Sequence, residues 1–108
     1  MVKTRPSRIA MWIINNIRDE LEVLMVEKKP ELLREIMDKV VELMEQVDEA
    51  SDYRIKWASW IDVADHVAME LCSAMESSDP LGCADTISEY LLYQFTGLTE
   101  EEMKRAPR

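Results

Sequence analysis

The sequence predicts an all-α protein: an up-and-down helical bundle of four main helices followed by a short C-terminal helical turn. The chain of 108 residues contains only two Gly and four Pro, the residues that most often interrupt helices. Hydrophobic residues make up 47% of it, which argues against disorder, and they recur at helical spacing. Typical cap residues stand where these periodic segments begin and end. We expect a single helical domain spanning residues 1–108.

The first two predicted helices are separated by a very short connection. Ser7 is a suitable N-cap for the first helix, which is expected to run to about Lys28. Lys29 is followed by Pro30, which suits the first position of a second helix because its missing N–H costs nothing there. The second helix is expected to end near Ala50. Such a short connection predicts either antiparallel neighbours or a sharply bent pair.

The third predicted helix begins with Ser51 or Asp52 as its cap and continues to about Glu76. On a helical wheel, one half of its surface is apolar. The members of this apolar half are Trp57, Trp60, Ile61, Ala64, Val67, Ala68, Leu71, Cys72 and Met75. We expect this half to face the core.

The fourth predicted helix has clear signals at both ends. Asp79 followed by Pro80 is a cap-plus-proline start, and Gly97 is the expected end. Thr99 and Glu102 then have the spacing of a capping box, which predicts a final short helical turn.

The acidic composition limits the classes of partner. The formal net charge is -9, which argues against free nucleic acid because phosphate contacts need Lys and Arg. Residues 30–50 contain seven acidic and two basic residues, so the second predicted helix is strongly acidic. A surface of this kind fits a basic protein patch, a cation, or simple solubility.

The two cysteines, Cys72 and Cys83, flank the turn predicted at residues 77–79. A helical hairpin allows them to pair, but our preferred interpretation is two reduced thiols in a cytoplasmic protein. This location is the default because Asn15 and Asn16 interrupt the N-terminal apolar run and no signal-peptide cleavage pattern follows. No run of about 18 apolar residues occurs, so we expect no membrane partner.

The first predicted helix is apolar on two sides. Its broad stripe consists of Ile13, Ile14, Ile17, Leu21, Leu24 and Met25. Trp12, Val23 and Val26 form a second stripe on the roughly opposite side. A helix of this kind packs between neighbours or against another chain. We therefore predict a homodimer with Trp12, Val23 and Val26 as interface residues; the alternative is that the chain's own C-terminal segment covers them.

Two pairs of carboxylates stand one helical turn apart on consecutive predicted helices: Glu42 with Glu45, and Asp62 with Asp65. Four carboxylates suit Mg²⁺, which prefers oxygen ligands. Over residues 31–95 this arrangement resembles the MazG-like nucleotide pyrophosphohydrolases, dimeric helical bundles with an ExxE pair and an ExxD pair. The resemblance implies Mg²⁺ bound by these four residues and hydrolysis of a nucleoside triphosphate to the monophosphate and pyrophosphate. Asp62 stands where that family has Glu.

The helical wheels favour a different function. Glu42 lies near the centre of the polar half of its helix, Asp62 and His66 lie opposite an apolar half, and Asp65 stands at its border. If both apolar halves enter one core, the two acidic pairs point outward. We find no catalytic motif and expect no cofactor. We therefore predict a small, acidic, non-enzymatic interaction module of the inhibitor, immunity or accessory-factor type, with the Mg²⁺-dependent enzyme as the alternative.

Overall fold

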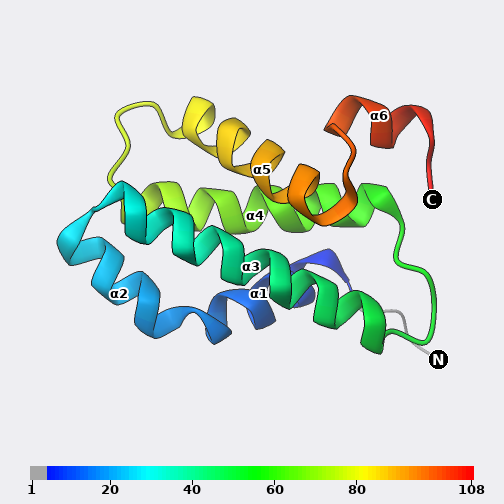
Figure 1. The fold of residues 1–108 in the computed structure, drawn as a ribbon, viewed down its shortest axis with the longest axis horizontal. Helices are drawn as coiled ribbons and strands as arrows, with labels where there is room; N and C mark the ends of the chain where they lie inside the picture. Colours follow the sequence, from blue (N-terminus) through cyan, green and yellow to red (C-terminus); the bar gives the residue numbers. More distant parts are fainter. Residues whose placement is uncertain (1–4) are drawn as a thin grey trace.

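The structure is a computed structural model that describes residues 5–108, and over this range the chain forms helices and no strands. The all-α prediction is confirmed, but six helices replace the four helices and short turn that were predicted. They are α1 (Pro6–Asn16), α2 (Arg18–Glu27), α3 (Pro30–Ala50), α4 (Trp57–Ala74), α5 (Pro80–Thr96) and α6 (Glu100–Arg105). Figure 1 shows α4 in the middle of the molecule, with α5 along one side and α1, α2 and α3 toward the other.

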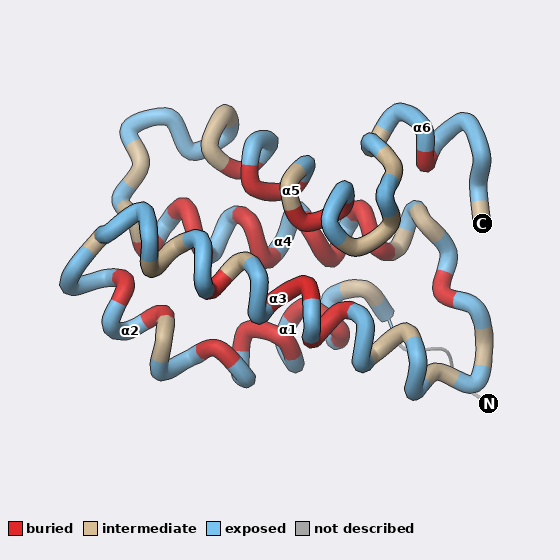
Figure 2. The backbone as a smooth tube through the Cα atoms, in the orientation of Figure 1, coloured by how far each residue is buried: buried red, intermediate tan, exposed pale blue. Residues whose placement is uncertain are grey.

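The core is centred on α4, which packs against α5, α1, α2 and α6. Trp60 is fully buried, and its ring lies 4.7 Å from that of Phe95 on α5. Val63 is also fully buried, although it lies outside the apolar half predicted for this helix. The reason is that α4 has neighbours on several sides, so more than one face of it is covered. Figure 2 shows the buried positions following α4 and the inner sides of its neighbours.

The predicted single first helix is wrong, because the chain leaves helical geometry at Ile17, where φ is -120° and ψ is 15°. Just before this point, the Asn16 side-chain amide donates to the Trp12 carbonyl at 2.8 Å. Ile17 N donates to the carbonyl of Ile14, three residues back, at 3.1 Å. An asparagine side chain that bonds to its own backbone competes with the helical ladder. The segment therefore becomes two helices joined at a buried residue.

The start of this segment also differs from the prediction. The residue before α1 is Arg5, and Pro6 occupies the first helical turn, so Ser7 lies inside the helix and does not cap it. The other end agrees with the prediction: Lys28 adopts a left-handed conformation with φ of 50°, and α3 begins at Pro30 and ends at Ala50.

The connection between α3 and α4 is longer than predicted. Residues 51–56 lie outside the helices, and α4 begins at Trp57 instead of following Ser51 or Asp52. The Ser51 hydroxyl donates to the Val47 carbonyl at 2.7 Å, back into the preceding helix. Ile55 is buried, so this connection packs a side chain into the core while it crosses to the start of α4. Neither predicted cap acts as one.

The predicted signals around α5 and α6 are confirmed. The Asp79 side chain accepts a hydrogen bond from Gly82 N at 3.2 Å, and Gly97 ends α5 with φ of 76°. Thr99 and Glu102 form the reciprocal hydrogen bonds of a capping box at the start of α6. The Thr99 backbone N–H that bonds to the Glu102 carboxylate lowers the pKa of that carboxyl group.

Candidate interaction surfaces

The outer face of α3 is a row of exposed carboxylates. Its members are Glu31, Glu35, Asp38, Glu42, Glu45 and Glu49, which we call the acidic face. They lie opposite a buried apolar face that includes Ile36, Val40 and Met44. Of these carboxylates, all except Asp38 lack an ion pair or hydrogen bond with any residue in the range 5–108. The acidic face is therefore left with five uncompensated negative charges.

The basic residues of α3 are held at its flanks instead. Lys39 forms an ion pair with Glu20 on α2, and the hydrogen bond from Lys39 lowers the pKa of the Glu20 carboxyl group. Arg34 Nε donates to the Tyr90 hydroxyl on α5 at 3.0 Å. That hydroxyl in turn donates to Asp38 Oδ1 at 2.7 Å, which raises the pKa of Tyr90. These contacts join α3 to its neighbours without neutralising the acidic face.

A second surface is the outer side of α1 and α2, where exposed apolar side chains stand among polar ones. Trp12, Val23 and Val26 are 43%, 44% and 83% exposed, so the structure leaves all three predicted interface residues open to solvent. Met11 and Met25 are exposed as well, although Met25 was predicted to lie on the broad stripe. We call these five residues the apolar surface. The alternative cover is not seen here, because the C-terminal helix α6 packs on α4 and α5.

The four carboxylates proposed as magnesium ligands are not brought together. Glu42 and Glu45 on α3 and Asp62 and Asp65 on α4 are all exposed. The closest neighbours of α3 are α5, α1 and α2, so the two pairs do not sit on facing helices. Within residues 5–108, no group of three or more His, Cys, Asp or Glu side chains is placed to hold a metal ion. His66 is exposed on the same side of α4 as Asp62.

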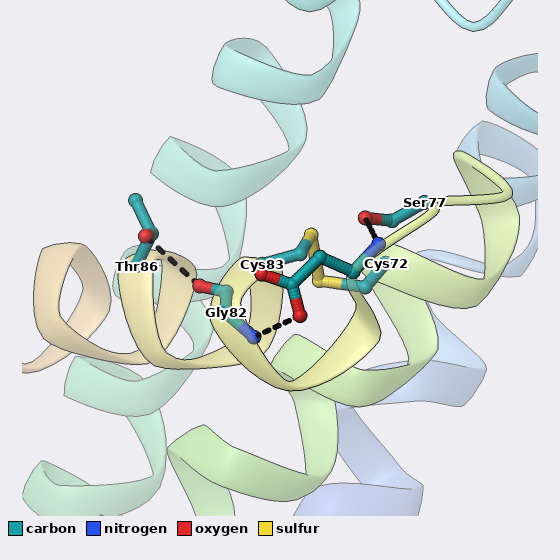
Figure 3. Close-up of a disulfide and its surroundings, with 6 residues drawn as sticks. Cys72, Ser77, Gly82, Cys83 and Thr86 are labelled. Atoms are coloured by element: carbon teal, nitrogen blue, oxygen red, sulfur yellow. Dashed lines mark hydrogen bonds between the residues drawn. A yellow bond between two sulfur atoms is a disulfide. The ribbon is translucent and has the colours of Figure 1, made fainter.

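The two cysteines are paired, so the preferred interpretation of reduced thiols is wrong for this structure. Figure 3 shows the disulfide between Cys72, in the last turns of α4, and Cys83, in the first turn of α5. Their Cα atoms are 6.0 Å apart, a separation that a disulfide readily spans. The antiparallel packing of α4 and α5 and the tight turn held by Asp79 and Gly82 bring the two positions together.

Comparisons with known proteins add no functional assignment. The chain matches no family model, none of the curated proteins and no solved structure. None of the helices within residues 5–108 combines the length and apolar character needed to cross a bilayer.

Proposed function

We propose that the protein is a non-enzymatic interaction module that binds a basic protein partner through the acidic face of α3. The observation that carries this proposal is the set of five exposed carboxylates on α3 without a partner in the described part of the chain. From residue 31 to residue 49 the helix rises about 27 Å, so the charges form a long stripe. A stripe of one sign steers an oppositely charged partner and fixes its orientation.

The experiment neutralises this stripe and compares it with an equal change elsewhere. The test variant carries Glu35→Gln, Glu42→Gln and Glu45→Gln. The matched control carries Asp62→Asn, Asp65→Asn and Glu70→Gln on α4, where the carboxylates are also exposed. Both variants are cross-linked to proteins in an extract of the source cells, and captured proteins are quantified by mass spectrometry. We expect basic proteins to be lost from the α3 variant alone; equal capture by both variants contradicts the proposal.

The proposed module is a homodimer joined through the apolar surface of α1 and α2. Two-fold symmetric dimers use the same patch on both subunits, and Trp12 is a residue type common among binding hot spots. Within one chain, we count α1 and α2 as one bent helix. The chain is then an up-and-down bundle of four elements with α6 appended. The acidic faces of two copies remain available because α3 is a different element.

Sedimentation measurements test the dimer. Trp12→Glu combined with Val26→Glu is expected to convert a dimer into a monomer with an unchanged helical circular dichroism spectrum. Leu81→Glu is the matched control, since Leu81 is 73% exposed but lies on α5. A monomeric mass for the unmodified protein, or the same loss of dimer in the Leu81→Glu control, contradicts this interface.

Two other predictions from the sequence are the magnesium-dependent hydrolase and the cytoplasmic location. The magnesium-dependent hydrolase has no observation in its favour, because its four carboxylates lie apart. A cytoplasmic location remains a prediction, and the Cys72–Cys83 disulfide weighs against it because disulfides are rare in that compartment. Alkylation of free thiols in intact cells, followed by mass spectrometry, measures whether the pair is oxidised where the protein resides.

A further inference from the structure

An open cavity of about 310 Å³ lies between the start of α1 and the loop that leads into α4. Three of its lining residues are basic: Arg5 from the first segment, and Arg54 and Lys56 from the second. Pro6, Tyr53, Ile55 and Ser59 also line it, and among residues 5–108 no acidic side chain does. None of the three cations forms an ion pair with another residue of the described chain. In a chain with a net charge of -9, this is a local concentration of uncompensated positive charge.

The cavity also lies beside the starts of two helices. Arg5 and Lys56 are the N-cap residues of α1 and α4, and neither helix start has a side-chain cap. At α4, Ser59 N and Trp60 N bond to the Lys56 carbonyl at 3.0 and 3.2 Å. Of the residues in this first turn, Lys56 and Ser59 line the cavity, whereas Trp57 and Ala58 do not. The start of a helix carries partial positive charge, so the start of α4, where Lys56 and Ser59 line the cavity, reinforces the three cations.

We propose that this cavity binds the phosphate group of a small soluble molecule. The planar arginine guanidinium donates paired hydrogen bonds to phosphate oxygens, and a lysine ammonium adds a point charge. The Ser59 hydroxyl supplies a neutral donor. The cavity volume is near the lower end of the range for small-molecule sites, which favours a compact ligand over an extended chain. The acidic face of α3 takes no part, so this proposal does not depend on the proposed function.

Binding is tested with inorganic phosphate by following backbone amide signals in NMR spectra, with chloride at equal ionic strength as the reference. We expect saturable shifts at Arg54, Lys56 and Ser59, which line the cavity, that chloride does not reproduce. Arg54→Gln combined with Lys56→Gln is expected to weaken binding by about tenfold or more, because charge-assisted hydrogen bonds are lost. Arg18→Gln is the matched control, since Arg18 is an exposed arginine on α2. Shifts equal to those caused by chloride, or unchanged binding in the double variant, overturn the proposal.

Two further binding measurements identify the kind of molecule that carries the phosphate. Glycerol phosphate, a soluble monoester, is expected to bind at least as tightly as inorganic phosphate and to shift the same amides. Vesicles of an anionic phospholipid are expected to cause no binding. Binding to vesicles without any response to either soluble phosphate overturns the assignment to a small soluble molecule. The outcome is independent of the α3 charge variants, which leave this cavity intact.

Discussion

Helices α1 and α2, which we call the α1–α2 arm, pack against α3, yet the arm exposes apolar side chains among its polar ones and α3 does so far less. Outside, α3 carries a row of carboxylates, whereas the arm carries Trp12 at 43% exposure and Val26 at 83%. Each buries an apolar face inside, with Ile17 in the arm and Met44 in α3 both fully buried. Covering one face of α3 is enough to bury its apolar side chains. The arm, in contrast, still exposes apolar area that a partner can bury.

The two regions also differ in continuity. Helix α3 runs without interruption for 21 residues, and its sequence contains no Gly or Asn and only the initial Pro30. The arm contains Asn15 and Asn16 and breaks immediately after them at Ile17. The break lets α1 and α2 follow different directions across the neighbouring helices. A clean amphipathic pattern therefore predicts one straight element, and a two-sided pattern with asparagines in its middle does not.

The largest expected effect tests the division of the arm into an inner and an outer side. Ile17→Ala removes a fully buried side chain at the junction of α1 and α2 and is expected to lower the free energy of unfolding by about 2–5 kcal/mol. Val26→Ala is the control and should change it by less than about 0.5 kcal/mol in the monomer. Urea unfolding measures both. A loss of unfolding free energy in Val26→Ala that grows with protein concentration supports the dimer. Equal losses in both variants contradict the division of the arm into an inner and an outer side.

Local signals predicted most of the fold because they act within one helical turn. Pro30, the Asp79 and Gly82 contact, Gly97 and the Thr99 capping box are all in place. The position of the α4 start was wrong because Ser51 resembles a cap only locally. In the structure its hydroxyl bonds to the preceding helix, and the buried Ile55 requires an extended crossing. That requirement comes from the placement of α3 and α4 in space, which no short stretch of sequence encodes.

The candidate surfaces were predictable to the extent that they depend on one helix. The helical wheel placed Trp12, Val23 and Val26 opposite the broad stripe, but only the tertiary structure shows that the C-terminal segment leaves them exposed. The basic cavity could not be predicted in the same way, because Arg54 and Lys56 belong to a loop that was expected to be helical. The disulfide depends on how closely α4 and α5 pack, which spacing alone does not give, and the sequence was therefore interpreted in favour of reduced thiols.

The next prediction concerns whether the α1–α2 arm and α3 unfold as one unit. Cys72→Ala combined with Cys83→Ala removes the bridge across the α4–α5 turn, which lies outside both regions. Opening a loop of this size is expected to lower the free energy of unfolding by about 3 kcal/mol. Hydrogen exchange should show equal losses of protection in α3 and in the α1–α2 arm, because both pack against the α4–α5 core. Reduction of the unmodified protein is the control and should reproduce the loss; protection that falls in only one region shows two separate units.

The smallest effect concerns the ion pair between Glu20 on α2 and Lys39 on α3, which directly joins the two regions. Both side chains are partly exposed, so solvent screens the pair and its contribution should be at most about 1 kcal/mol. The pKa of Glu20 is lowered in the folded protein from its ordinary value of 4.5, mainly by the hydrogen bond from Lys39. The stabilisation is therefore fully present above pH 4.5 and is lost as the pH falls through the lowered pKa.

Urea unfolding of Glu20→Gln and of the unmodified protein measures this contribution as a difference between the two. The difference is expected at pH 7 and should shrink as the pH falls below 4.5 and passes through the lowered pKa of Glu20. High salt should also reduce it at pH 7, because the pair is screened. Glu22→Gln, at an exposed position on the same helix, is the control and should show no such pH dependence. A difference that persists at low pH means that Glu20 joins α2 to α3 by packing instead of charge.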